Sequence, residues 1–255
     1  MLRFLLLLSF SANLLGFFIK NSNNHIRFSM TTNLRKKENN IDIYFPKNSK
    51  QEEYNKYLSD DKIKLIFSIG PAGTGKTLFA CQKAITELKN NKINKIILTR
   101  PIITLEEDIG FLPGVLNKKM EPWVKPFFDI FEEYCSPNEL NNYIFNNKIE
   151  ISPLLFMRGR TFKNCIIIAD EMQNSSPNQM KMLLTRIGTG CKMLITGDLA
   201  QSDIIKENGL GDFIKKYNLH NENGERVSGI KIISFSGEQV ERSKIVQNIL
   251  NIYDN

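Results

Sequence analysis

The stretch that decides the fold is IKLIFSIGPAGTGKT, residues 63–77. Its first part, residues 63–69, is apolar at nearly every position, which predicts a short strand covered on both faces of a sheet. Three glycines within the next six residues end that strand, and residues from about 75 to 90 have helical spacing. A strand, a glycine-rich turn and a helix in this order are the first half of a βαβ unit.

The rest of the chain repeats this alternation. Strands are predicted at 63–69, 95–99, 148–152, 164–170, 191–196 and 229–235, and helices at about 75–90, in an aromatic-rich segment, near 177–187 and from the last strand to about 252. Strands that alternate with helices predict an α/β fold of three layers, α/β/α, around a mainly parallel sheet. The Asn/Lys tract near 138–148 and the segment 218–229 are expected to be surface connections.

Composition fits one globular domain. The chain has 255 residues, of which 42% are hydrophobic and 24% charged. Its four cysteines lie far apart without a C-x-x-C pair, which favours buried side chains over a zinc site or a disulfide framework. The two histidines lie in segments that look peripheral, so chemistry based on histidine is not expected. The cysteines are Cys81, Cys135, Cys165 and Cys191.

The formal net charge of +7 is concentrated at the N-terminus. Residues 1–37 hold six Lys and Arg and no acid, which leaves +1 on the rest of the chain. The overall charge is therefore no evidence for nucleic-acid binding, although a local basic patch stays open.

Residues 1–40 predict a targeting segment rather than part of the domain. One Arg followed by a mostly apolar run is typical of a signal peptide, and the Asn-, Ser- and Thr-rich basic stretch after it is typical of a transit peptide. Together they indicate a bipartite presequence for a secondary, apicoplast-like plastid. Plain secretion, a retained membrane anchor, AT-rich coding bias, another organelle or the cytoplasm are the alternatives. The domain is expected at 41–255, not embedded in a membrane.

The glycine-rich turn fits the pattern G-x-x-x-x-G-K-[ST], and the preceding strand and following helix are the context that pattern requires. Its backbone N–H groups and the helix N-terminus suit a phosphate chain. Lys76 is expected to reach the β- and γ-phosphates and Thr77 to bind Mg²⁺. The nucleotide-binding residues predicted here are Gly70, Pro71, Ala72, Gly73, Thr74, Gly75, Lys76 and Thr77.

An acidic pair follows the buried strand at 164–170. Parallel sheets present ligands at the carboxyl ends of their strands, so Asp170 is expected to hold Mg²⁺ and Glu171 to polarise the attacking water. Capping of the next helix is the alternative for this pair. The adjacent Asp-Glu favours ATP, and the chain has no N-K-x-D motif for guanine.

The stretch ITGDLAQSD, residues 195–203, follows another predicted core strand. Its end opens onto the same edge of the sheet, so Gln201 is expected to sense the γ-phosphate. An amide can donate to a phosphate oxygen and accept from water. An ordinary surface turn is the alternative.

The motifs together resemble one family. The sequence contains, in order, motifs that resemble those of the PhoH family, which are P-loop ATPases related to the superfamily 1 helicase core. These motifs are GPAGTGKT, ILTRPI, IGFLPG, FMRGRT, ADEMQN, QMKMLLTRIG and TGDLAQSDI. The resemblance covers about residues 41–253. It implies a RecA-like fold with ATP and Mg²⁺ as cofactors.

The resemblance also implies roles for single residues near the nucleotide. Gln51 resembles the glutamine that reads the adenine edge, with Tyr54 as support; a solvated helix start is the alternative. Arg242 corresponds to an arginine sensor of the γ-phosphate. The surrounding EQVERSK departs from the family's usual DVVRH, so an exposed helical Arg is an equal alternative.

Four further residues are candidates for nucleic-acid contact. Thr99 and Arg100 resemble a helicase motif that faces the nucleic-acid backbone, with a structural ion pair as the alternative for Arg100. Arg158 and Arg160 in FMRGRT are placed by the resemblance to contact RNA or a neighbouring subunit's phosphates.

A helical set of large side chains precedes residue 135. Core packing is the first interpretation, with a subunit interface and base stacking as alternatives. Its members are Trp123, Phe127, Ile130, Phe131 and Tyr134.

These features predict an ATPase that couples hydrolysis to RNA remodelling or ribosomal RNA processing. The resemblance implies a hexamer-like ring of identical subunits and a YbeY-type endoribonuclease as partner, and no nuclease activity is expected in the chain itself. The main alternative is an ATP-switched adaptor that assists a separate endoribonuclease without motor activity. A nucleotide kinase is disfavoured by the two carboxylates and Gln201.

Overall fold

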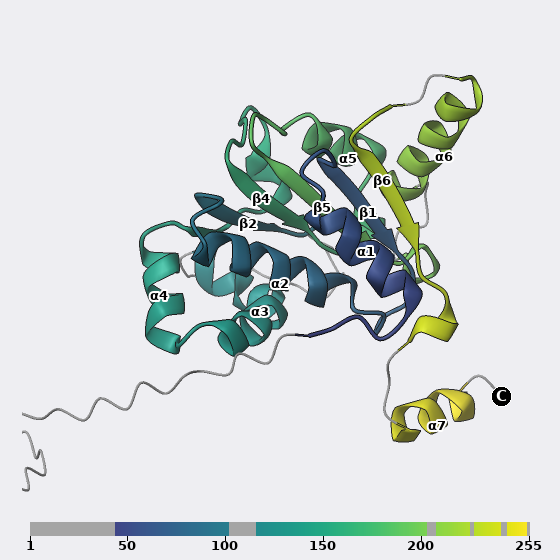
Figure 1. Cartoon of the computed structure of the whole chain (residues 1–255), viewed down its shortest axis with the longest axis horizontal. Helices are drawn as coiled ribbons and strands as arrows, with labels where there is room; N and C mark the ends of the chain where they lie inside the picture. Colours follow the sequence, from purple (N-terminus) through teal and green to yellow (C-terminus); the bar gives the residue numbers. More distant parts are fainter. Residues whose placement is uncertain (1–43, 102–115, 203–207, 225–226, 241–243, 254–255) are drawn as a thin grey trace, which may run out of the picture. The chain divides into compact units, whose positions relative to one another are not determined.

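The computed structural model describes residues 44–101, 116–202, 208–224, 227–240 and 244–253 (Figure 1). The targeting segment predicted at 1–40 lies outside these ranges, so it remains a prediction. The strands are β1 (Leu65–Ile69), β2 (Lys95–Thr99), β3 (Ile149–Ile151), β4 (Cys165–Ala169), β5 (Lys192–Gly197) and β6 (Ile230–Ser234). The α-helices are α1 (Ser49–Ser59), α2 (Lys76–Lys89), α3 (Leu116–Tyr134), α4 (Pro137–Phe145), α5 (Pro177–Leu184), α6 (Gly209–Glu222) and α7 (Lys244–Tyr253).

The six strands form one sheet in the order β3-β2-β4-β5-β1-β6, and every neighbouring pair is parallel. Strand β1 therefore lies between β5 and β6, and β4 lies beside β5. The glycine-rich turn, the acidic pair and the turn at 197–202 follow strands β1, β4 and β5, so all three meet at one edge of the sheet. The predicted α/β fold with a parallel sheet is confirmed.

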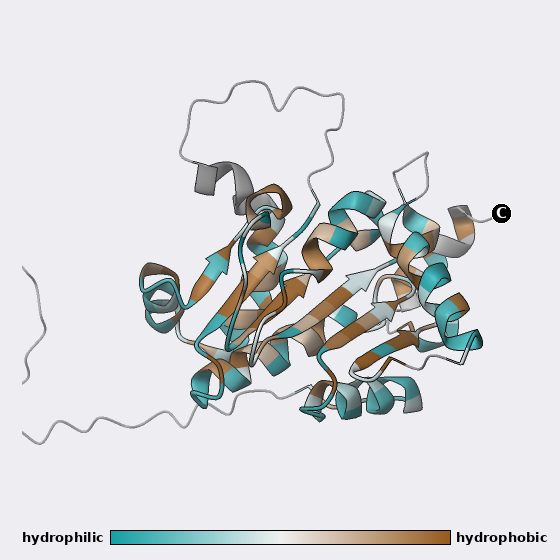
Figure 2. Cartoon of the chain, turned by 90° about the horizontal axis from the view of Figure 1, so that it is seen from above, coloured by the Kyte–Doolittle hydropathy of each residue, from teal (hydrophilic) through white to brown (hydrophobic). Residues whose placement is uncertain are grey.

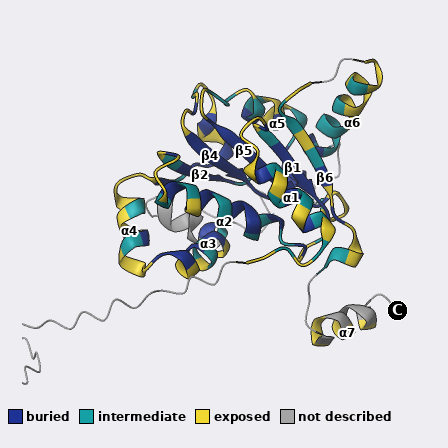
Figure 3. Cartoon of the chain, in the orientation of Figure 1, coloured by how far each residue is buried: buried dark blue, intermediate teal, exposed yellow. Residues whose placement is uncertain are grey.

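Helices cover both faces of the sheet. Helices α1 to α4 pack with side chains such as Ile66 and Leu194 on one face, and α5 and α6 pack with Phe67 and Ile195 on the other. Adjacent residues of a strand thus enter opposite cores, as the period of two requires. The strands are mostly apolar in Figure 2 and mostly buried in Figure 3, as expected of central parallel strands.

Two segments predicted as connections are partly helical. The tract near 138–148 contains α4, whose N-terminus is capped by Ser136 and begins with Pro137, and which buries Leu140. Segment 218–229 begins inside α6, which starts from an Asn208 cap. In both places the prediction was wrong because capping and a few buried contacts outweigh a polar composition.

Other predictions about the interior are confirmed. All four cysteines are buried and free. In the aromatic helix α3, Phe127, Phe131 and Tyr134 are buried in the core under α2, which favours the core-packing interpretation. None of the helices in the described ranges is long and apolar enough to cross a bilayer.

Candidate nucleotide-binding site

The glycine-rich turn leaves β1 at its carboxyl end and leads into α2. Gly70 has φ 139°, and a Cβ there would lie 2.4 Å from the carbonyl oxygen of Phe235. Its N–H donates to the Gly197 carbonyl at 3.0 Å. Gly75 is the N-cap of α2 with φ 86°, a left-handed conformation that favours glycine. The turn is thus fixed between the ends of β5 and β6, where only glycine fits.

Lys76, the first residue of α2, folds its side chain back onto the turn. Its Nζ donates to the carbonyl oxygens of Gly70 at 2.6 Å and Pro71 at 2.7 Å. Burial lowers the pKa of this ammonium group, while Asp198, Asp170 and Glu171 act in the opposite direction. An almost buried cation among three carboxylates can be stabilised further by anionic ligand groups.

Asp170 lies at the carboxyl end of β4 and gathers three partners. Its Oδ1 accepts a hydrogen bond from Thr77 Oγ1 at 2.9 Å and another from the hydroxyl of Thr196. Its Oδ2 is ion-paired with Arg100, whose guanidinium lies 3.8 Å from a carboxylate oxygen of Glu171. Because Asp170 is buried, these contacts offset the cost of removing its charge from water.

Glu171 leaves the strand in a left-handed conformation, with φ 54° and ψ 37°. Its side chain is 43% exposed. The amide of Gln173 donates to Glu171 Oε2 at 2.6 Å. The carboxylate therefore points out of the sheet edge rather than capping the next helix: Ser176 caps α5.

The turn after β5 carries Asp198 and Gln201. Asp198 is buried and accepts from the Ala200 N–H at 3.0 Å, while the Gln201 N–H donates to the Asp198 carbonyl at 3.1 Å. The Gln201 side chain is exposed and lines the same cavity as Lys76.

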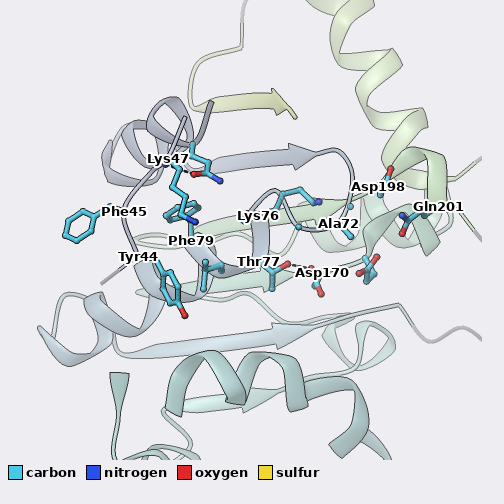
Figure 4. A pocket seen from close by; sticks show the side chains of 16 residues that line it. Tyr44, Phe45, Lys47, Ala72, Lys76, Thr77, Phe79, Asp170, Asp198 and Gln201 are labelled. Carbon is cyan, nitrogen blue, oxygen red and sulfur yellow. Dashed lines mark hydrogen bonds between the residues drawn. The ribbon is translucent and has the colours of Figure 1, made fainter. Parts of the chain in front are cut away.

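These groups surround a cavity of about 480 Å³ (Figure 4). In Figure 4, Asp170, Asp198 and Gln201 lie at one end and the aromatic rings of Tyr44 and Phe45 at the other, with Lys76 between them. Lys76 and the glycine-rich turn are therefore suited to a phosphate chain, and the aromatic end is suited to a flat apolar group. The lining residues are Tyr44, Phe45, Lys47, Gln51, Ala72, Gly73, Gly75, Lys76, Thr77, Leu78, Phe79, Asp170, Glu171, Gly197, Asp198 and Gln201.

Gln51 lies in α1 and is buried against the glycine-rich turn. Its Nε2 donates to the Thr74 carbonyl at 3.2 Å, and its Oε1 accepts from the Lys47 N–H at 2.8 Å. Tyr54, one turn later, donates to the Lys76 carbonyl at 3.3 Å. Burial raises the pKa of the Tyr54 phenol well above its usual value. Helix α1 is thus attached to the glycine-rich turn and the start of α2, and the amide of Gln51 keeps one N–H for a ligand.

The nucleic-acid candidates occupy different environments. Thr99 is only 2% exposed, and its hydroxyl has no hydrogen-bond partner among the described residues. Arg100 forms the ion pair given as its alternative. Arg160 donates to Glu150 Oε1 at 2.6 Å and stacks on the ring of Phe162. Of the four, only Arg158 is classed as exposed. The candidate Arg242 lies outside the described residues.

Two features of the site were missed in the sequence. Tyr44 and Phe45 were not singled out, since nothing before α1 marks them as lining a cavity. Gln173, within the stretch ADEMQN, was assigned no role, because its contact with the Asp198 N–H joins residues 25 positions apart.

A glycine-rich turn between a parallel strand and a helix, with its Lys and Thr beside a buried Asp at the end of another strand of the same sheet, defines a P-loop protein. A family model described as PhoH-like protein matches residues 44–254. The chain belongs to the PhoH family.

Relatives of known name agree with that assignment. The chain is 43% identical over 190 residues to a PhoH-like protein of Bacillus subtilis strain 168, a match that covers 74% of this chain and 58% of the relative. It is 38% identical over 213 residues to a PhoH-like protein of Synechocystis, covering 84% and 63%. Against Protein PhoH of Escherichia coli K12 the identity is 36%, covering 81% and 57%. The chain thus spans about 60% of the length of these relatives.

Solved structures give a more distant likeness. The chain is similar to the Pif1 helicase from Candida albicans with a TM-score of 0.41 and 16% identity, covering 83% of this chain and 44% of that one. The SWI2/SNF2 ATPase core of Sulfolobus solfataricus gives a TM-score of 0.39 and 12% identity, covering 72% and 43%.

Proposed function

We propose that the protein binds ATP with Mg²⁺ in this cavity and hydrolyses it. The observation that carries the proposal is the 2.9 Å contact between Thr77 Oγ1 and Asp170 Oδ1 beside the Lys76 ammonium. A hydroxyl and a carboxylate from two different elements, next to a lysine at a helix N-terminus, are the groups that P-loop proteins use for nucleoside triphosphates.

The residues present fit Mg²⁺. Thr77 and Asp170 offer adjacent oxygen atoms, the donor type that Mg²⁺ prefers, and the ion needs only one or two protein ligands when phosphates supply others. When bound there, Mg²⁺ would neutralise charge on the β- and γ-phosphates.

Side chains of this protein supply the remaining functions. Lys76 exchanges the carbonyl oxygens of Gly70 and Pro71 for phosphate oxygens, a stronger pairing because both partners are charged. Glu171 orients the attacking water, and Gln201 donates to the γ-phosphate. Gln51 and the rings of Tyr44 and Phe45 hold the adenine end.

The test is ATP turnover by the full chain, compared with Glu171→Gln. The wild type should release phosphate in a reaction that needs Mg²⁺, and the variant should bind ATP normally but turn it over at least about 10²-fold more slowly. Normal turnover by Glu171→Gln would remove Glu171 from its role. A wild type that binds no ATP would contradict the whole proposal.

We further propose that this turnover serves RNA remodelling or RNA processing. Family membership and the exposed Arg158 at the end of the η1 turn (Leu154–Met157) support it. Single-stranded RNA should raise the ATPase rate, and Arg158→Ala should weaken RNA binding more at low salt than at high salt. A rate that RNA does not change would favour the second candidate.

The second candidate is an ATP-switched adaptor. The ion pair between Arg100 and Asp170 favours it, because binding of Mg²⁺ at Asp170 would compete with that pair and so change the position of Arg100. Slow turnover, combined with ATP-dependent capture of a YbeY-type endoribonuclease, would support the adaptor. Mass measurement with and without ATP tests the proposed hexamer-like ring.

Delivery to a secondary plastid is proposed from residues 1–40 alone. A fluorescent protein carrying these residues should reach that organelle and lose the segment on import. Accumulation in the cytoplasm would contradict the proposal.

A further inference from the structure

Gln173 lies in the short turn η2 (Met172–Asn174) that follows the acidic pair, and it is 1% exposed. The nitrogen and the oxygen of its side-chain amide each make a hydrogen bond. Its Nε2 donates to Glu171 Oε2 at 2.6 Å, and its Oε1 accepts from the backbone N–H of Asp198 at 3.1 Å. One side chain thus connects the carboxylate after β4 to the turn after β5.

A further hydrogen bond, to the backbone of Gln173, reinforces this connection. The Gln173 carbonyl accepts a hydrogen bond from Ser202 Oγ at 3.1 Å. Asp198 and Ser202 are the two ends of the turn that carries Gln201, and the Gln201 N–H donates to the Asp198 carbonyl within it. Gln173 therefore contacts both ends of the turn on which Gln201 lies.

The Glu171 carboxylate needs a hydrogen-bond partner to hold one orientation, and its backbone already adopts an uncommon conformation. Only four residues other than glycine have positive φ in the described part of the chain, and Glu171 is one of them. Its half-exposed side chain would otherwise sample several rotamers. A short hydrogen bond to a charged acceptor restricts that freedom.

Space for the amide is provided by Gly197. A Cβ at this position would lie 2.8 Å from Gln173 Oε1 and 2.6 Å from a methyl group of Leu210. A side chain there would displace the amide of Gln173 or the side chain of Leu210 in α6. The absence of a side chain at Gly197, at the end of β5, thus leaves room for the Gln173 amide to reach the Asp198 N–H.

We infer that Gln173 is a positioning residue that fixes Glu171 and couples it to the turn carrying Gln201. A movement of that turn on contact with a γ-phosphate is transmitted through the Asp198 N–H to the amide, and from the amide to the carboxylate. The inference rests on the proposed function in one respect, that Glu171 acts on the attacking water.

Two substitutions in the full chain separate the contributions of the two hydrogen bonds that the Gln173 amide makes. Gln173→Glu keeps an acceptor for the Asp198 N–H but replaces the amide that donates to Glu171 by a second carboxyl group, which disfavours the charged form of Glu171; Gln173→Met removes both polar ends. Both variants should lower kcat at least about tenfold while ATP affinity changes less than about twofold. The reason is that the orientation of Glu171 stabilises the transition state and does not contribute to ATP binding. Only Gln173→Met should speed hydrogen exchange at Asp198.

The double variant Glu171→Gln/Gln173→Glu tests whether Gln173 acts through Glu171. It should turn over ATP no more slowly than Glu171→Gln alone, because residues that act as a unit are not additive. Multiplied losses in the double variant, or wild-type kcat in Gln173→Glu, would overturn the inference.

Failure of the inference and failure of the proposed function give different results. If the wild type bound ATP but did not hydrolyse it, the proposed hydrolysis would fail. Hydrogen exchange would still decide the connection: faster exchange at 198–202 in Gln173→Met, but not in Gln173→Glu, supports it. Exchange unchanged in both variants overturns it.

Discussion

Thr77 and Asp170 meet across 2.9 Å, the first from the N-terminus of α2 and the second from the end of β4. Replacement of Thr77 by Val removes the hydroxyl without changing the shape of the side chain. We expect the affinity for ATP with Mg²⁺ to fall by about tenfold or more, which corresponds to about 1.4 kcal/mol. Titration with ATP in Mg²⁺ and in EDTA measures this loss.

Two comparisons isolate the metal contribution. Thr77→Ser keeps a hydroxyl at the same place and should bind ATP with Mg²⁺ nearly as the wild type does. In EDTA the affinities of wild type and Thr77→Val should converge. A Val variant that is weakened equally in EDTA would show that the hydroxyl acts on the fold or on the phosphates instead.

Lys76→Ala should lose ATP affinity by at least about 100-fold, or about 2.8 kcal/mol, since a charged donor to the phosphates is removed. Lys83→Ala is a matched control on the same helix, where the lysine pairs with Glu87 instead. The control should bind ATP normally, and calorimetry can compare both. Equal affinity of Lys76→Ala and the control would refute the phosphate assignment of Lys76.

Gln201→Ala should leave ATP affinity within about twofold of the wild type and lower RNA-stimulated turnover. The reason is that the exposed amide contacts a γ-phosphate only when the turn is correctly placed, while Lys76 and the glycine-rich turn supply most of the binding. Phosphate release with and without single-stranded RNA measures the effect. If RNA stimulated both proteins equally, residues 198–202 would be an ordinary turn.

Glu150→Gln should lower the free energy of unfolding by roughly 1–2 kcal/mol at neutral pH. Burial raises the pKa of Glu150, but hydrogen bonds from Arg160 and Lys95 outweigh it, so the pKa in the folded protein lies below its usual value of 4.5. The carboxylate therefore stabilises the fold above pH 4.5, and that contribution is lost as pH falls through the lowered pKa.

Urea unfolding at a series of pH values checks this pH dependence. The difference between wild type and Glu150→Gln should be constant above about pH 5.5 and shrink below pH 4.5. Asp129→Asn, which removes an exposed pair with Lys125, is the control and should change stability by less than about 0.5 kcal/mol. A difference that grew in acid would have the wrong sign for this explanation.

Much of the fold could be predicted because buried parallel strands have a strong signal. Every predicted strand lies within two residues of its observed bounds, since a run such as CIIIA has no stable place except between two covered faces. Helix α4 was not predicted. Its local signal is the cap, Ser136 followed by Pro137, which the polar Asn/Lys composition outweighed in the prediction, and the burial of Leu140 depends on neighbours that a sequence window does not contain.

The site residues also fall into those with a local sequence signal and those whose contacts are distant in sequence. Fixed local spacing made the glycine-rich turn and Asp170 predictable. The partner of Arg100 was left open, because the contact with Asp170 joins residues 70 positions apart through the pairing of β2 and β4. The role of Gln173 depends on the neighbouring strand β5, so no local pattern could specify it.

The internal contacts of Lys76 and Asp170 have a consequence for inhibitor selectivity. A phosphate mimic has to displace a lysine from two carbonyl oxygens, and it meets an arginine that is already paired with a carboxylate. A neutral aromatic compound seated against Tyr44 and Phe45 leaves all of these contacts in place. Compounds of the second kind should therefore favour the nucleotide-free protein, and ATP should compete with them only through the adenine end of the cavity.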